Sequence, residues 1–181
     1  RVSCSAEVAE NAVVLPRFGF KFVLPENFED ISYFGYGPYE SYEDKRLASR
    51  ISLFKTTATK NFEPYVRPQE NMAHTDTRWV EVANNAGFGL MATNTAESGS
   101  FSFNCSHFTA EMLTKTAHDF ELEPLADTVV YLDYRHAGIG SNSCGPQLAE
   151  QWRLSEKEFS FSVRLIPVQI NDVDPFEKIY N

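Results

Sequence analysis

The chain has 181 residues, of which 25 are acidic and 16 basic, and its net charge is −9. This balance argues against nucleic acid and anionic membranes as partners, because both are bound through clustered Lys and Arg. The composition, with 43% hydrophobic and 23% charged residues, is that of a folded protein, and no apolar run reaches the roughly 18 residues of a transmembrane helix.

Alternation of apolar and polar residues dominates the chain and predicts antiparallel strands that bury one face. The clearest strands are predicted at 18–24, 100–104, 129–134 and 159–165, and weaker ones at 31–34, 48–55, 78–83, 88–93 and 148–154. Turn sequences rich in Gly, Pro and Asn separate these segments. An all-β sandwich follows from this pattern.

One stretch has the features of a short helix. Thr109 can cap its start, Glu111 lies in the first turn, and Lys115 and His118 lie near its end. The long polar segment 55–76 is predicted to be an ordered surface loop. Because no linker or internal repeat interrupts the chain, we expect one domain spanning residues 1–181.

Three cysteines, Cys4, Cys105 and Cys144, allow at most one disulfide, and the chain has no Cys-x-x-Cys pair. A zinc ribbon or a thioredoxin motif is therefore excluded. The N-terminal residues lack the apolar core of a signal peptide. We expect a cytoplasmic bacterial protein, with the periplasm as the alternative.

The residues alone single out no catalytic group. The four histidines have no metal-binding spacing, so no metal site is predicted. Glycoside hydrolysis needs a pair of carboxylates, and Glu40, Glu43, Glu70 and Glu97 are all candidates. Their spacing in the sequence favours no particular pair.

Several short motifs occur together and in order. They lie at 15–20 (Leu-Pro-Arg-Phe-Gly-Phe), 36–45, 64–71 (Pro-Tyr-Val-Arg-Pro-Gln-Glu-Asn), 77–78, 101–104 and 136–140. In this combination the chain resembles the C-terminal module of bacterial β-galactosidases of glycoside hydrolase family 2. The resemblance covers roughly residues 13 to 166.

This resemblance implies a galactose-mutarotase-like supersandwich of antiparallel sheets. It also implies a parent enzyme that hydrolyses terminal β-D-galactosides such as lactose with retention. The catalytic glutamates and a magnesium site of that enzyme belong to a barrel domain that is absent from this sequence. We therefore expect no catalytic residue, no metal and no cofactor in this chain, and we expect the chain alone to be inactive.

The resemblance further implies that the partners are the β-galactoside and the remaining domains or a large subunit of the β-galactosidase. By the same resemblance, the N-terminal strands of the family module would precede Arg1. Exposed strand edges of such a fragment would favour pairing between copies, so a homo-oligomer is a further hypothesis.

Six residues are predicted at the rim of the sugar site. In the family one loop of the module closes the edge of that site, and we place it just before Phe101, at Glu97 and Ser98. The tryptophan that family members carry in this loop is absent from both positions.

The other four residues are Glu70, Asn71, Arg78 and His136. A bidentate pair between Arg78 and a carboxylate would fix the segment 64–76 against the next strand, and the same planar groups match pairs of sugar hydroxyls. His136, before a glycine turn, is either a rim residue or the partner of a backbone carbonyl.

Two alternatives to a non-catalytic β-galactosidase domain stay open. One is an autonomous carbohydrate-binding or mutarotase-like module, in which His136 with Glu40 or Glu70 would act as base and acid. The other is a structural assembly domain without sugar contact.

Overall fold

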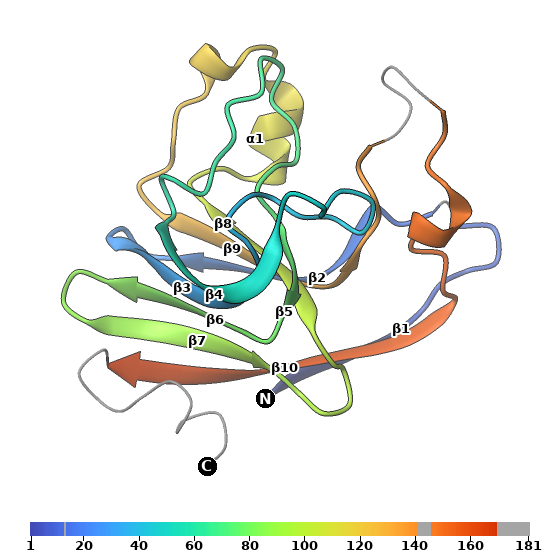
Figure 1. Ribbon diagram of the computed structural model, residues 1–181, viewed down its shortest axis with the longest axis horizontal. Helices are drawn as coiled ribbons and strands as arrows, with labels where there is room; N and C mark the ends of the chain where they lie inside the picture. The colour runs from blue at the N-terminus through green and yellow to red at the C-terminus, as the bar shows by residue number, and fades with distance from the viewer. Residues whose placement is uncertain (13, 141–145, 170–181) are drawn as a thin grey trace.

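Two antiparallel sheets form a sandwich, as expected from the alternating pattern (Figure 1). The computed structural model describes residues 1–12, 14–140 and 146–169. In this part of the chain one sheet has the strand order β1-β10-β7-β6-β3-β4 and the other has the order β2-β9-β8-β5. The strands are β1 Val2–Glu7, β2 Arg17–Leu24, β3 Phe28–Gly37, β4 Arg50–Thr57, β5 His74–Thr77, β6 Trp79–Asn84, β7 Phe88–Asn94, β8 Phe101–Ser106, β9 Thr128–His136 and β10 Glu158–Gln169.

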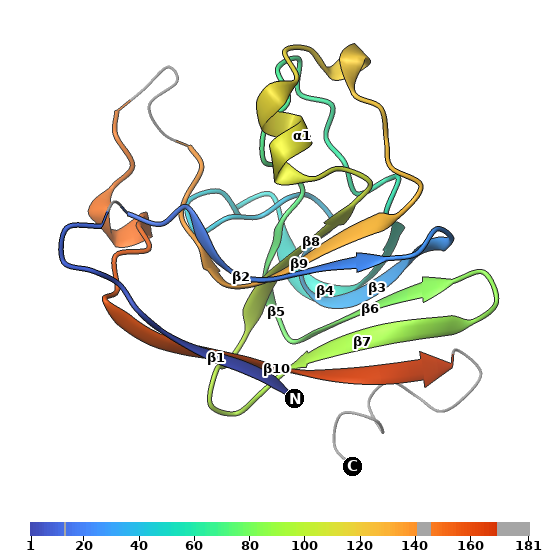
Figure 2. The same ribbon diagram turned by 180° about the vertical axis from the view of Figure 1, so that it is seen from behind.

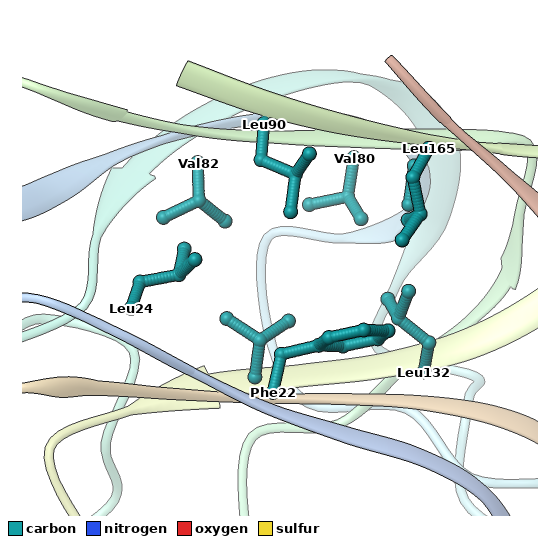
Figure 3. Close-up of a pocket in the computed structure, with 9 residues that line it drawn as sticks. Phe22, Leu24, Val80, Val82, Leu90, Leu132 and Leu165 are labelled. Carbon is teal, nitrogen blue, oxygen red and sulfur yellow. The ribbon is translucent and has the colours of Figure 1, made fainter. Parts of the chain in front are cut away.

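The core lies between the two sheets, where aromatic and branched side chains of alternate positions meet. Tyr33 of β3 and Phe103 of β8 are almost fully buried, and their rings lie 5.0 Å apart in an edge-to-face contact. Figure 3 shows Phe22, Leu24 and Leu132 of one sheet facing Leu90, Val82, Val80 and Leu165 of the other. They line a void of about 10 Å³, which is apolar and barely large enough for one water.

A second, smaller apolar cluster lies on the opposite face of β6. Val80 and Val82 point into the main core, so the alternation of the strand turns Trp79 the other way. Trp79 packs there with Met91 and Val168 and is 3% exposed. Trp79 is thus a buried packing residue.

Most of the predicted strands are confirmed, and one is wrong. The segment 148–154 contains the 3₁₀ turn η2 Glu150–Trp152 instead of a strand. Two strands were not predicted. The alternation in β1 is carried by small side chains, and β5 is made of polar residues that become a strand only by pairing with β8.

The predicted helix is confirmed as α1 Ala110–Lys115, and the Thr109 side chain accepts a hydrogen bond from Met112 N. His118 lies beyond the helix, at the start of the 3₁₀ turn η1 Asp119–Glu121. Figure 2 shows α1 and η1 on one end of the sandwich, beside the segment that connects β4 to β5. No helix in the described residues is long and apolar enough to cross a membrane.

Candidate functional site

A group of polar side chains gathers where β2 begins and β9 ends. We call it the Arg17–Glu70 cluster. Its members are Arg17, Tyr42, Glu70, Tyr131, Asp133 and His136. Antiparallel pairing places Arg17 opposite His136, and a register shift follows between Phe18 and Gly19. The connections β3–β4 and β4–β5 add Tyr42 and Glu70, so the cluster joins four segments that are distant in the sequence.

Arg17 is the centre of this cluster and binds two carboxylates. Its Nη2 and Nε donate to Asp133 Oδ2 at 2.5 Å and Oδ1 at 3.3 Å, and its Nη1 donates to Glu70 Oε2 at 2.8 Å. The guanidinium also lies 4.2 Å from the centre of the Tyr131 ring. Burial by itself would lower the pKa of Arg17, but Asp133 and Glu70 outweigh it and raise that pKa.

A glycine permits this close packing. A Cβ atom at position 19 would lie 2.6 Å from Asp133 Oδ1, which is far too close for a real contact. Asp133 can therefore approach β2 and reach Arg17 only because residue 19 has no side chain. This explains why the Leu-Pro-Arg motif continues with glycine two residues after Arg17.

The second oxygen of Glu70 is held only loosely. Glu70 Oε1 lies 3.5 Å from the Tyr42 hydroxyl and 3.8 Å from His136 Nε2. Burial raises the pKa of Glu70, while Arg17 and His136 oppose that rise. Burial also raises the pKa of Tyr42 well above its ordinary value, and Glu70 and Glu40 add to this effect. Tyr42 thus stays protonated and donates to Glu70.

His136 forms the carbonyl contact that was one of its two predicted roles. Its Nδ1 lies 2.7 Å from the Ala137 carbonyl oxygen, and its ring packs edge-to-face on Tyr42 at 5.2 Å. Since a carbonyl oxygen only accepts, Nδ1 carries the hydrogen in that contact, and Nε2 is the ring nitrogen that faces Glu70. His136 and Glu70 are therefore neighbours, as a rim site would require.

The chemistry of the cluster is that of a clamp. One guanidinium binds two carboxylates, one 3% exposed (Asp133) and one 24% exposed (Glu70). A glycosidase pair instead needs one protonated carboxyl and one free nucleophile facing the sugar. The cluster fixes the β4–β5 connection on β2 and β9, and Glu70 Oε1 is the carboxylate oxygen that has only long contacts.

Asn71 stabilises the loop next to Glu70. Its Oδ1 accepts from Glu63 N at 3.0 Å, its Nδ2 donates to Gln69 O at 2.9 Å, and its carbonyl accepts from Asn104 Nδ2. At 3% exposure, the Asn71 side chain has its polar atoms engaged within the protein.

The predicted bidentate pair between Arg78 and a carboxylate does not form within the described residues. Arg78 lies between β5 and β6, where the buried neighbours Thr77 and Trp79 leave its side chain exposed. No contact of Arg78 with Glu70 forms within the described residues. Arg17 takes this role, because strand pairing with β9 places it against Asp133 and Glu70.

Glu97 and Ser98 lie elsewhere, in the turn between β7 and β8. Glu97 is exposed and pairs with Arg1 at 3.2 Å. Ser98 Oγ accepts from Ser162 N at 2.7 Å and so ties the turn to β10. The structure therefore groups Glu70 with His136 and Asn71, and separates Arg78, Glu97 and Ser98 from them.

A second polar cluster surrounds Glu40, which the sequence offered only as one of several candidate carboxylates. This carboxylate is 9% exposed; it accepts from Lys45 Nζ, from the Tyr65 hydroxyl at 2.5 Å and from Met72 N at 3.0 Å. Burial alone would raise the pKa of Glu40, but these hydrogen bonds outweigh it and lower that pKa. Glu40 is thus a charged side chain whose hydrogen bonds join the β3–β4 connection to the β4–β5 connection. Only its motif neighbours Lys45 and Tyr65 could have indicated this.

The structurally described positions contain no group of three or more His, Cys, Asp and Glu side chains that could hold a metal ion. Cys4 and Cys105 are free thiols, and burial raises the pKa of Cys105, so this thiol stays protonated. Cys144 lies outside the described residues.

The chain matches a protein-family model described as beta galactosidase small chain over residues 1–165. It is 43% identical to a β-galactosidase of Staphylococcus xylosus over 157 residues, 86% of this chain and 15% of that protein. A β-galactosidase of Actinobacillus pleuropneumoniae is 41% identical over 84% of this chain, and one of Kluyveromyces lactis is 32% identical over 83%. The chain spans about one seventh of the length of these relatives, 14–15% in each case. The resemblance seen in the sequence motifs is confirmed: the chain belongs to the beta galactosidase small chain family.

Proposed function

We propose that this chain is one domain of a β-galactosidase that hydrolyses terminal β-D-galactosides such as lactose. In this proposal the chain shapes the rim of the active site and takes part in assembly, and the remaining six sevenths of the protein perform the chemistry. The parent enzyme is proposed to be a retaining member of glycoside hydrolase family 2.

One observation carries the proposal. The relatives match this chain along 83–86% of its length, yet the match occupies only 14–15% of theirs. The geometry agrees with a supporting role, because Arg17 holds both carboxylates, Glu70 and Asp133, in ion pairs. Two carboxylates that share one guanidinium are poorly suited to act as nucleophile and acid.

Rim contact with the sugar is proposed for Glu70 and His136. Glu70 Oε1 has only long contacts within the protein, so it can accept a hydrogen bond from a sugar hydroxyl. Rim contact stays a prediction for Glu97, Ser98 and Arg78, which lie apart from Glu70 in the described structure. Asn71 supports the loop that carries Glu70.

The magnesium ion that the resemblance implies is proposed to bind in the remainder of the protein. In the described part of this chain the acidic residues of the cluster are occupied by Arg17, and no metal-binding group is formed. We also propose a cytoplasmic location, which the free thiols of Cys4 and Cys105 support.

Turnover of a chromogenic β-galactoside tests the proposal. Three samples are compared: this chain, the β-galactosidase without the corresponding segment, and their mixture. Turnover that needs both parts supports the proposal. Turnover by this chain alone contradicts the proposal. Glu70 and His136 would then be the candidates for the catalytic acid and base.

A further inference from the structure

The largest exposed apolar side chains gather on neighbouring loops. Leu47, Phe120, Val66 and Tyr39 are 104%, 80%, 77% and 63% exposed, more than any other large apolar residue of the described segments. They lie in the β3–β4 connection, the β4–β5 connection and the segment around η1. The Asp119 N–H donates to the Val66 carbonyl oxygen at 3.2 Å, which joins the last two.

A groove of about 460 Å³ opens between the first two of these loops. We call it the 39–72 groove. Its apolar lining comes from Tyr39, Leu47, Ala48, Tyr65 and Met72, and its polar lining from Glu40, Asp44, Lys45, Arg46 and Glu63. A groove of this size can take one or a few side chains of another polypeptide.

The charges in the groove are largely compensated inside the protein. Glu40 binds Lys45, Asp44 accepts from Ile139 N at 3.1 Å and Gly140 N at 2.8 Å, and Arg46 pairs with Asp76 at 3.2 Å. These side chains therefore have little need of a charged ligand. What the groove still offers is its apolar surface.

The loop that carries Tyr39 and Leu47 is held in place by its own hydrogen bonds. Ser41 N donates to Ala73 O at 2.7 Å, and Ser49 Oγ donates to Tyr39 O at 3.0 Å. Tyr42 and Lys45 exchange backbone hydrogen bonds of 2.9 and 3.1 Å. Apolar side chains on a fixed loop are typical of an interface, because binding then costs little ordering of the chain.

We propose that the 39–72 groove docks on the remainder of the β-galactosidase polypeptide, with Tyr39 and Leu47 as the apolar anchors. The inference rests on the proposed function, since it needs the larger protein. The matched segment is 15% of the Staphylococcus xylosus relative, so 85% of such a protein is available to cover the groove. The surface of the remainder that contacts the groove presents apolar side chains. The reason is that the charges of the groove are largely paired within the protein, while its exposed anchors Tyr39 and Leu47 are apolar.

Hydroxyl-radical footprinting of the complete β-galactosidase tests this proposal with a matched pair of leucines. Leu53 of β4 is 50% exposed and Leu47 is 104% exposed. On a free surface Leu47 should therefore oxidise about twice as fast as Leu53. Docking predicts the reverse order, with Leu47 the slower of the two, whereas faster oxidation of Leu47 overturns the proposal.

The partner is identified by placing the photoreactive residue p-benzoylphenylalanine at position 47 of the complete protein. Cross-links to peptides outside these 181 residues support docking on the remainder of the polypeptide. Cross-links only to another copy of this chain overturn it in favour of self-association.

Turnover of a chromogenic galactoside by the same sample separates the two proposals. An active protein with a fast-reacting Leu47 refutes the docking surface and leaves the proposed function intact. A complete protein without turnover contradicts the proposed function itself.

Discussion

Replacing Arg17 by methionine should strongly destabilise the protein. Methionine keeps much of the aliphatic length of Arg17 but removes the charge shared by Asp133 and Glu70. Leaving a buried carboxylate without its partner typically costs about 3–5 kcal/mol. Asp133, 3% exposed, cannot be hydrated, whereas Glu70, 24% exposed, can be in part. We therefore expect a loss near the lower end, about 3 kcal/mol.

Urea unfolding measures this loss directly. With a slope of about 2 kcal/mol per molar urea, a loss of about 3 kcal/mol lowers the midpoint by about 1.5 M. The matched control is Arg135→Met. Arg135 pairs with Glu156, and both side chains are about one-third exposed (31% and 34%). That variant should lose at most about 1 kcal/mol.

The effect of Arg17→Met should also depend on pH. Burial already raises the pKa of Glu70, and loss of Arg17 raises it further. A folded carboxyl with a raised pKa favours the folded state below the unfolded pKa, and this benefit is lost as pH rises through the folded pKa. The variant should therefore be less destabilised at pH 5 than at pH 8. A loss no larger than that of Arg135→Met, at either pH, would refute the clamp.

Three further predictions test other parts of the structure. Phe103→Ala should lose about 3–5 kcal/mol of unfolding free energy in urea, because Phe103 is fully buried. Phe120→Ala, at an exposed site, should lose less than about 0.5 kcal/mol, and equal losses would contradict the assigned core. Burial lowers the pKa of His74 from 6.5 to about 4. The unfolded chain therefore takes up the proton first, and stability should fall by up to about 3 kcal/mol as pH drops through this window. A His74→Gln variant with the same pH slope would rule this out. Gly138→Ala places a Cβ atom 2.5 Å from Asp44 Cγ and should cost about 1–3 kcal/mol by calorimetry. In an Asp44→Ala background this cost should largely vanish, and a persistent cost would point to another cause.

The candidate site shows where inference from sequence reached its limit. Glu70 and His136, which were both predicted at the sugar rim, lie next to each other in the structure, and their contact with a sugar stays a prediction. The arginine that fixes the segment 64–76 was predicted to be Arg78, which is close in sequence. The true partner, Arg17, is 53 residues away and reaches Glu70 through the pairing of β2 with β9.

The strand predictions show the same division. Strands with one strongly apolar face, such as Arg17–Leu24 and Glu158–Gln169, were predicted because alternation is a local property. His74–Thr77 was not, because its residues are polar and become a strand only against Phe101 and Phe103 of β8. Its first residue, His74, is buried and forms hydrogen bonds with the Asn61 side chain and the Tyr36 carbonyl oxygen, which no local pattern indicates.

Residue types at short, regular spacing were enough to indicate the all-β class, the helix capped by Thr109, and the family. Which charges meet depended on the tertiary structure, because strand register and loop packing join positions that are tens of residues apart. It alone showed that Glu40 and Glu70 are bound by Lys45 and Arg17, and that Leu47 is left exposed beside a rigid groove.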